Sequence, residues 1–430
     1  MEIIKYIDFI KAYTKSLRWL FNKHDLREQI AMIKEGSGTN FMHYLIVTNN
    51  YNSVIKRLKK ERTKRKLRVC FVVSEPSKWN MQSLYDELIK SELFYPFIVV
   101  SNLFHLENRP TYQHILEFYR SVASNVEVGW DEKRERGIDL KKFSPDIVFY
   151  QQPSDIYSNQ NIPYVSSFAL TFYLSYAIED TYSVAKDHLF EFYLLLSKYF
   201  VYSKTYKDFF LSSCPYKISN IVSIEGHPKL DVYADYHPDS YAHKYVIYAP
   251  HHSFYKSLLK YGTFPWSGQF ILNWAKLHPE INWVFKPHPR FKVALQEEGL
   301  MSFEEIESYF SEWDKLGIVY EDGNYFELFK NSRCLITDCG SFLTEYLPTQ
   351  MPVIHLRNIN AKEYSPTNAE IIKSYYKAFD LLDLSSLLDE VILKMNDPLK
   401  KERVNKIEEL GLQQFHATHN IIKELKALLH

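Results

Sequence analysis

The chain has 430 residues, more than one ordinary hydrophobic core holds, so two domains of roughly 150–200 residues each are the first expectation. A hydrophobic share of 46% with 24% charged residues excludes a disordered or fibrous chain, and a formal net charge of zero gives no indication of a nucleic-acid partner. The four cysteines show no CxxC pair or other metal-binding spacing, which favours a reducing compartment, the cytoplasm.

Residues 1–66 are predicted to form a helical and basic segment ahead of the domains. Apolar residues at helical spacing between Ile3 and Phe21 predict an amphipathic helix, and the charges among them leave no apolar run that fits a signal peptide. Residues 56–68 hold nine basic residues and one acidic residue. This run is either a solvated helix end or a surface attracted to the inner face of the cytoplasmic membrane, where each cation contributes roughly 1 kcal/mol. No run reaches the ~18–20 apolar residues of a membrane span, so we expect a cytoplasmic protein, with a peripheral position on that membrane as the second interpretation.

Residues 67–235 are predicted to form the first α/β domain. Continuous apolar runs, separated by helical stretches such as 78–91 and 111–124, indicate parallel strands covered by helices on both faces. The predicted strands are 67–74, 97–101, 146–150, 162–166, 199–203 and 220–224. The polar, proline- and tyrosine-rich stretch 225–244 has no periodicity, and we expect the crossing between domains there.

Residues 236–397 are predicted to form a second doubly wound domain, and residues 398–430 to form closing helices. The predicted strands of this half are 244–250, 281–287, 317–321, 333–338 and 352–356, with helices near 266–278, 303–315, 324–331 and 341–348. Ligands of open parallel sheets bind beyond the carboxyl ends of the strands. Three strands of this half end in polar clusters, which are Pro250-His251-His252-Ser253, Pro287-His288-Pro289-Arg290 and Asp338-Cys339-Gly340-Ser341.

The residue types at these three strand ends favour a phosphate site. Arg290 is suited to bidentate pairing with a phosphate, and His288 can donate a charge-assisted hydrogen bond. Gly340 permits a tight turn, and Ser341 is expected to cap the helix that follows, whose first turns include Glu345. Each feature alone also fits an ordinary strand–helix junction. The sequence contains neither GxGxxG nor a Walker A loop, so a dinucleotide enzyme and a P-loop ATPase are not supported.

The paired histidines His251 and His252 are candidates for the catalytic base. Alternation predicts that they face different ways, so one of them would meet the donor phosphate or act as base and the other would be structural. A histidine of ordinary pKa, about 6.5, accepts a proton from a hydroxyl at neutral pH. No HExxH or other zinc pattern occurs, and adjacent histidines are poorly placed to share one metal, so we expect no metal site.

The first domain offers weaker signals at its strand ends. Gln151 and Gln152 follow one predicted strand, and Ser166 and Ser167 follow the next. These residues are either contacts for an acceptor molecule or ordinary structural polar groups.

Several of these segments resemble one family in order and spacing. YAP at 248–250, HP at 288–289, ITDxxSxxxEY at 336–346 and GHPKLD at 226–231 are similar to the CDP-glycerol:poly(glycerophosphate) glycerophosphotransferases of teichoic-acid and capsule synthesis. The resemblance covers roughly residues 200–360. It implies a GT-B-like fold, in which two Rossmann-like domains face each other across a cleft, and it implies that His288 contacts the donor pyrophosphate. Asp338 and Ser341 would then lie at the phosphate or ribose of the donor.

One departure from the family pattern concerns the catalytic base. The family's first half carries a Trp-His-Gly signature whose histidine is assigned as base, and this chain has none; the matching region is 165–173. The base would then be His251 or His252.

The sequence therefore supports three hypotheses. The first is a transferase of surface-polysaccharide synthesis that moves glycerol phosphate, or a related polyol phosphate, from a CDP-activated donor to a glycan or lipid-linked glycan. The second is a glycosyltransferase that uses a CMP-, CDP- or UDP-activated sugar, and the third is a non-catalytic binding protein of the same fold. The expected catalytic residues are His251, His252 and His288, and the expected donor-binding residues are Ser253, Arg290, Asp338, Gly340, Ser341 and Glu345. We expect no cofactor other than the nucleotide-activated donor as substrate.

Overall fold

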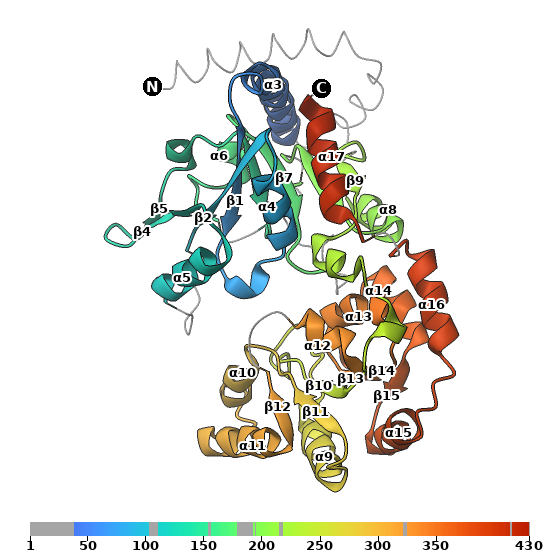
Figure 1. Cartoon of the computed structure of the whole chain (residues 1–430). Helices are drawn as coiled ribbons and strands as arrows, with labels where there is room; N and C mark the ends of the chain where they lie inside the picture. Colours follow the sequence, from blue (N-terminus) through green and yellow to red (C-terminus); the bar gives the residue numbers. More distant parts are fainter. Residues whose placement is uncertain are drawn as a thin grey trace. The chain divides into compact units, whose positions relative to one another are not determined.

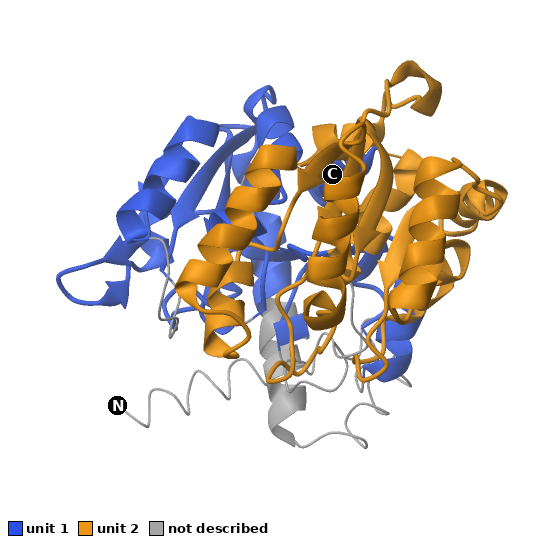
Figure 2. Ribbon diagram, turned by 90° about the horizontal axis from the view of Figure 1, so that it is seen from below, with its two compact units in different colours: residues 1–177, 184–231, 416–430 blue, residues 178–183, 232–415 orange. Residues whose placement is uncertain are grey.

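The chain divides into two compact units, each of which is described by itself (Figure 2). The computed structural model describes residues 38–102, 111–153, 156–178, 192–193, 195–214, 218–320, 325–412 and 415–429. Unit 1 comprises residues 1–177, 184–231 and 416–430, and unit 2 comprises residues 178–183 and 232–415. The amphipathic helix predicted between Ile3 and Phe21 lies outside the described residues.

Unit 1 is built on a seven-stranded sheet in the order β3-β2-β1-β6-β7-β8-β9, and every neighbouring pair is parallel. Its strands are β1 (Leu67–Val73), β2 (Phe94–Val100), β3 (Val126–Val128), β6 (Ile147–Tyr150), β7 (Leu170–Leu174), β8 (Lys198–Val201) and β9 (Val222–Ile224). A small antiparallel hairpin, β4 (Trp130–Asp131) and β5 (Arg136–Gly137), interrupts the alternation. The central strands are buried on both faces, which is why their sequences are continuously apolar.

Helices from both ends of the described chain complete the core of unit 1. Val54 and Leu58 of α3 pack in the same cluster as Ile421 and Leu425 of α17. The helices are α3 (Gly38–Glu61), α4 (Gln82–Ile89), α5 (Tyr112–Val122), α6 (Ile162–Val165), α8 (Lys204–Ser213) and α17 (Ala417–Leu429), with 3-10 turns at Pro76–Lys78, Leu140–Phe143 and Pro228–Tyr233. The segment 1–66 was predicted to stand ahead of the first domain, whereas Val54 and Leu58, at the described end of α3, are buried in the core of unit 1.

One predicted strand of unit 1 is a helix. Residues 162–166 were expected to extend the sheet, but Ile162–Val165 forms α6, and the strand begins later, at Leu170. The side chain of Asn161 accepts a hydrogen bond from the backbone N–H of Tyr164, and Pro163 occupies the first turn. A capping residue followed by proline is a helix start, and it outweighs the β-branched residues in the same run.

Unit 2 contains a six-stranded parallel sheet in the order β12-β11-β10-β13-β14-β15. Counted within the unit this is the order 3-2-1-4-5-6 of a doubly wound, Rossmann-like sheet. The strands are β10 (Tyr245–Ala249), β11 (Asn282–Phe285), β12 (Gly317–Val319), β13 (Ser332–Thr337), β14 (Val353–Leu356) and β15 (Tyr376–Ala378). The strands predicted for this half are confirmed.

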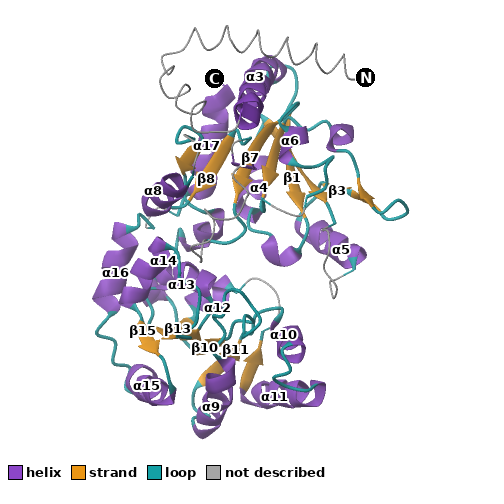
Figure 3. Ribbon diagram, turned by 180° about the vertical axis from the view of Figure 1, so that it is seen from behind, coloured by secondary structure: helices purple, strands orange, loops and turns teal. Residues whose placement is uncertain are grey.

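Helices cover both faces of the unit 2 sheet (Figures 1 and 3). One face carries α9 (Phe264–Leu277), α10 (Phe291–Glu297), α11 (Phe303–Leu316) and α15 (Leu381–Leu387). The other carries α13 (Gly340–Tyr346), α14 (Pro366–Ile371) and α16 (Lys400–Glu409), and α12 (Phe326–Lys330) precedes β13. Short 3-10 turns lie at Pro238–Ser240, Leu347–Thr349 and Ile372–Ser374, and a π-helical segment follows α15 at Leu388–Leu393.

The predicted closing segment 398–430 is divided between the units. Helix α16 belongs to unit 2, whereas α17 returns to unit 1. Asp231, the last residue of the central part of unit 1, accepts hydrogen bonds from the backbone N–H groups of Ala417 and Thr418, both at 2.8 Å. This carboxylate caps α17. Unit 1 ends at Asp231 in this part of the chain, four residues before the predicted boundary at 235. Among the described helices, none has the length and apolar character that crossing a membrane requires.

Candidate functional site

The site of unit 2 lies where its strand order reverses, between β10 and β13. Strand β10 pairs with β11 on one side and β13 on the other, and both connections leave from the carboxyl edge of the sheet. The polar clusters that follow β10, β11 and β13 are therefore brought to one edge, as their positions at strand ends predict. The backbone N–H of His288 donates to the carbonyl of Pro250 at 3.1 Å, which ties the first two clusters together.

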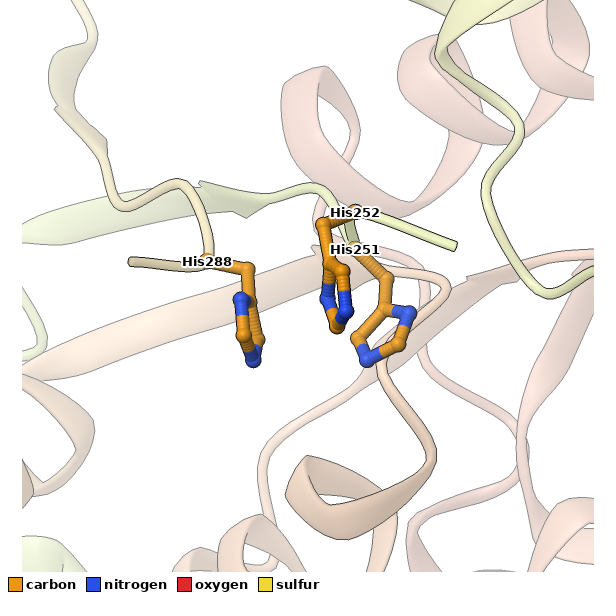
Figure 4. Close-up of side chains that lie close together, drawn as sticks. All are labelled: His251, His252 and His288. Carbon is orange, nitrogen blue, oxygen red and sulfur yellow. The ribbon is translucent and has the colours of Figure 1, made fainter. Parts of the chain in front are cut away.

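The three histidines of this edge form one cluster (Figure 4). The ring centroids of His251 and His252 are 4.4 Å apart, those of His251 and His288 are 5.0 Å apart, and those of His252 and His288 stack at 3.9 Å. The prediction that the paired histidines face different ways is wrong. Strand alternation ends with β10 at Ala249, and the turn after Pro250 brings both rings to the same side.

Two buried side chains fix the backbone that carries His251. Asp338 accepts hydrogen bonds from the N–H of His251 at 2.6 Å and from the N–H and hydroxyl of Thr263 at 2.6 and 2.8 Å. The hydroxyl of Ser253 lies 2.7 Å from Nδ1 of His251 and accepts the N–H of Tyr261 at 3.0 Å. Asp338 and Ser253 were predicted to bind the donor, but both are at most 1% exposed and their polar atoms are used within the chain. These hydrogen bonds hold the backbone that carries His251.

Burial keeps the three rings uncharged at neutral pH. It lowers the pKa of His251 and of His288 well below the ordinary value, and the neighbouring histidines add to the effect. The pKa of His252 is lowered to about 4, by burial first and by the charge of Arg290 second. Burial also raises the pKa of Asp338 to about 6, against the hydrogen bonds from Thr263 and His251.

The hydrogen bonds within the cluster leave the Nε2–H groups of His251 and His288 as donors for a ligand. Nδ1 of His288 accepts the backbone N–H of Arg290 at 3.1 Å, so the proton of the neutral ring lies on Nε2. The N–H of Ser253 approaches Nδ1 of His251 at 3.3 Å in the same way. Nδ1 of His252 is buried without a hydrogen-bond partner among the described residues. These rings can present N–H groups to an anion without themselves being charged.

The same cluster is the one group of described residues in which three potential metal ligands meet. One nitrogen from each ring lies within 4.8 Å of the others. A tetrahedral zinc site would need these nitrogens at Zn–N distances of about 2.0–2.1 Å. The positive charges of Lys286 and Arg290 also act on His288 and disfavour a cation there. The two rings of the adjacent residues His251 and His252 do come together, contrary to the reason given for expecting no metal site. The positive charges around the cluster nevertheless suit an anion better than a metal ion.

Arg290 and Lys286 supply the charges of this edge. The side chain of Arg290 is 56% exposed and pairs with Glu297 at 3.5 Å, so it can turn toward a ligand. Lys286 is buried, and its ammonium lies 4.7 Å from the ring of Tyr325 and 5.3 Å from that of Phe342. Contacts of this kind stabilise a buried cation.

The residues that follow β13 differ from expectation in detail. The N-cap of α13 is Cys339 and not Ser341, which lies in the first turn with its hydroxyl 3.4 Å from the sulfur of Cys339. The carbonyl of Gly340 accepts a hydrogen bond from Asn368 at 3.2 Å. Glu345 was predicted to contact the donor substrate. It is fully buried, and its carboxylate accepts a hydrogen bond from the hydroxyl of Tyr325 at 2.5 Å.

Residues from other segments also support the cluster, and no motif in the sequence marks them. Thr263 lies directly before α9, where a threonine ahead of Phe-Pro suggests only a helix cap. The ring of Tyr261 stacks on that of Tyr364 at 4.6 Å and lies 6.0 Å from the ring of His251. No motif in the sequence marks Thr263 or Tyr261 as supports of the histidines, and Tyr364 is more than 100 positions from His251.

Two Rossmann-like units in one chain, with polar groups gathered at the carboxyl edge of the second sheet, define a GT-B-like α/β protein. Neither a protein-family model nor the sequence of a characterised protein matches the chain. Solved structures do match its fold. The wall teichoic acid polymerase TagF matches with a TM-score of 0.53 at 12% identity, over 91% of this chain and 98% of that one.

Two epimerases are similar to the chain in fold. A UDP-N-acetylglucosamine 2-epimerase matches with a TM-score of 0.56 at 14% identity, over 84% of this chain and 95% of that one. The UDP-GlcNAc 2-epimerase from Neisseria meningitidis bound to UDP-GlcNAc matches with a TM-score of 0.51 at 14% identity, over 84% of this chain and 100% of that one. At such identities the likeness shows the fold, and the predicted fold class is confirmed.

Proposed function

We propose that the chain is a transferase of cell-surface polysaccharide synthesis that moves a polyol phosphate, such as glycerol phosphate, from a CDP-activated donor to a hydroxyl of a glycan or lipid-linked glycan. The observation that carries the proposal is the convergence of His251, His252 and His288 at the carboxyl edge of the unit 2 sheet, with Arg290 beside them. Buried N–H donors next to an exposed guanidinium suit the diphosphate of such a donor.

The transfer has one bond-forming and one bond-breaking event. The acceptor oxygen attacks the distal phosphorus, the bond from that phosphorus to the bridging oxygen breaks, and CMP leaves with the bonding electrons. Negative charge that develops on the leaving phosphate is met by N–H groups already in place, which costs little reorganisation.

His252 is the stronger candidate for the base that takes the acceptor proton. Its Nδ1 has no partner among the described residues, whereas Nδ1 of His251 lies against the hydroxyl of Ser253. A pKa of about 4 makes His252 a weak base in the free protein. Because a bound diphosphate brings negative charge beside the ring, it raises this pKa toward the operating pH.

A nucleotide-sugar glycosyltransferase is the alternative. The missing Trp-His-Gly signature favours it, because that signature is the part of the resemblance tied to glycerol phosphate chemistry. In that case the acceptor attacks the anomeric carbon, and the same cluster would hold the leaving nucleotide. A non-catalytic binding protein would bind the nucleotide and transfer nothing.

Donor identity and turnover can be tested together. CDP-glycerol, CDP-ribitol, CMP-sugars and UDP-sugars are screened by thermal shift, followed by transfer assays with the compound that stabilises most. A cytidine preference supports the proposal, and a uridine preference overturns it in favour of the glycosyltransferase. We expect His288→Ala to lower turnover at least ~100-fold, the size typical of losing one such donor. His278→Ala, at the far end of α9, is the matched control and should leave turnover unchanged.

A peripheral position on the inner membrane surface remains part of the proposal. In the basic run 56–68, Arg57 and Arg65 contact the buried carboxylate of Asp146, so they serve the fold. Lys56, Lys59, Lys60 and Lys64 are exposed and available to an anionic surface. We expect replacement of these four lysines by glutamine to abolish co-sedimentation with phosphatidylglycerol vesicles; equal sedimentation would contradict the membrane role and leave the transfer reaction untouched.

A further inference from the structure

Two loops of unit 2 lie side by side beyond the carboxyl edge of its sheet. The β10 loop, residues 254–262, connects the polar cluster after β10 to helix α9, and the β14 loop, residues 357–363, follows β14. The backbone N–H of Lys362 in the second loop donates to the carbonyl of Leu259 in the first at 2.8 Å. This bond holds the two loops together, so their exposed side chains belong to one surface.

The β10 loop has a packed base and an exposed tip. The N–H of Gly262 donates to the carbonyl of Ser253 at 2.8 Å, which closes the loop at its base. Phe254 and Tyr261, the residues just inside that bond, are each 1% exposed, whereas Leu258 between them is 89% exposed. A fixed base therefore presents an apolar tip to the surroundings of the chain.

The second loop adds another exposed apolar side chain to this tip. Ile359 is 83% exposed, and it and Leu258 have the highest exposure among the large apolar side chains that the structure describes. Tyr255 adds a ring that is 62% exposed. Single exposed apolar residues are common on protein surfaces. The two most exposed ones on loops that hydrogen-bond to each other indicate a surface for a partner.

The charged residues around this apolar surface are mainly basic. Two nearby carboxylates are engaged within the chain, Glu297 with Arg290 at 3.5 Å and Glu298 with the backbone N–H of Lys256 at 2.9 Å. Within the two loops, one acidic residue, Glu363, stands against four basic ones, which are Lys256, Lys260, Arg357 and Lys362. An excess of positive charge therefore accompanies the apolar tip.

We propose that the two loops form a membrane contact on unit 2, in which Leu258, Ile359 and Tyr255 enter the interface of an anionic bilayer and the basic residues beside them meet its headgroups. Apolar side chains gain by leaving water, tyrosine is typical of the headgroup level, and lysine and arginine are attracted to anionic lipids. A second copy of the chain would bring the same excess of positive charge to this surface, which disfavours self-association through it.

This contact is distinct from the lysines of α3, which belong to unit 1, and it does not rest on the proposed transfer reaction. A single signal gives only weak and reversible membrane binding, and stable binding takes two, so the loops and the α3 lysines would act together. The ring of Tyr261, at the base of the β10 loop, lies 6.0 Å from that of His251. Insertion of the tip would thus bring a lipid surface close to the histidine cluster, where a lipid-linked acceptor is of use.

The test measures co-sedimentation of the full chain with vesicles of phosphatidylglycerol and of phosphatidylcholine. We expect Leu258→Ser/Ile359→Ser to bind phosphatidylglycerol vesicles at least ~10-fold more weakly than the wild type, because its two loop tips no longer bury apolar surface. Its Tm should be unchanged, since both side chains are exposed. The wild type should bind phosphatidylcholine more weakly than phosphatidylglycerol, because the basic residues then meet no anionic headgroup.

Leu277→Ser/Leu382→Ser is the matched control. These leucines are 77% and 82% exposed, but they lie on α9 and α15, outside the two loops, so this variant should sediment like the wild type. Insertion is measured directly with a bimane label on Leu258→Cys in a Cys214→Ser background, since the other three cysteines are buried. Brominated acyl chains should quench this label and leave the same label on Leu382→Cys unquenched.

The inference is overturned if the loop variant sediments like the wild type, if the control variant loses as much binding, or if the label at position 258 is not quenched. Equal binding to both lipids would overturn the role of the basic residues. A loss of nucleotide affinity in the loop variant with vesicle binding intact would overturn the inference in favour of the donor site, and a dimer that dissociates in this variant would overturn it in favour of a second copy. The α3 proposal fails separately, when the variant without its four lysines still sediments.

Discussion

Replacing Asp338 by asparagine tests whether this buried carboxylate positions the histidine cluster. Asp338 accepts three hydrogen bonds, from the N–H of His251 and from the N–H and hydroxyl of Thr263. Asparagine keeps one oxygen and turns an NH₂ group toward the other donors, so at least one buried backbone N–H loses its acceptor. A buried unpaired donor costs about 1–3 kcal/mol, and near 2 kcal/mol this lowers the Tm of a unit of this size by about 4–8 °C.

The effect of Asp338→Asn should grow in mild acid. The pKa of Asp338 is about 6 in the folded chain and 3.8 ordinarily, so the folded state holds the proton more tightly. The stability that this carboxyl contributes is therefore full below pH 3.8 and is lost as the pH rises through 6. Asparagine lacks this term, so the difference between wild type and variant should be larger at pH 5 than at pH 7.5, by about 1 kcal/mol.

Urea unfolding at the two pH values measures both quantities, and nucleotide affinity is measured alongside. We expect a weaker affinity for the donor nucleotide, because the turn that carries His251 is released. Asp231→Asn is the matched control, since Asp231 also accepts two backbone N–H groups but caps α17 in unit 1. It should lower stability without changing nucleotide affinity. An unchanged stability of Asp338→Asn, or equal losses of affinity in both variants, would refute the positioning role.

Three further outcomes are expected. Affinity for the donor nucleotide should rise as the pH falls from about 6.5 toward 4. A bound anion raises the lowered pKa of His252, so binding takes up a proton. Calorimetry that shows affinity falling over this pH range would contradict anion binding at the cluster. Zinc added at equimolar concentration should leave the Tm unchanged, whereas a rise of several degrees would establish a metal site at the histidines. Ser302→Ala removes the hydroxyl of the capping box that begins α11 and should cost about 1 kcal/mol in chemical denaturation, without an effect on turnover.

Most of the buried strands were predictable from the sequence, because both sheets are buried on two faces. Runs such as 67–74 and 333–338 are continuously apolar, and every strand predicted for unit 2 was found. The mistake at 162–166 has a local cause that the sequence also contains, since Asn161 and Pro163 are helix-start residues. The return of α17 to unit 1 could not be predicted, because it depends on Asp231 meeting residues 186 and 187 positions later.

The candidate site was predictable in its position and not in its internal roles. Strand ends gave the histidines and Arg290, because parallel strands bring their carboxyl ends to one edge. Which polar residue meets a ligand and which supports the edge depends on burial. Asp338 and Ser253 carry the residue types of ligand contacts, yet their atoms are used up by Thr263, Tyr261 and His251. The partners of Asp338 lie 75 and 87 positions away, where no spacing rule reaches.

Side-chain chemistry explains why the two switch points, between β10 and β13 in unit 2 and between β1 and β6 in unit 1, differed so much in the sequence. In unit 2 the edge is marked by histidine and arginine, which are conspicuous because they titrate or carry charge. In unit 1 the corresponding edge carries Gln151, whose amide never titrates and which alone fits an ordinary structural residue.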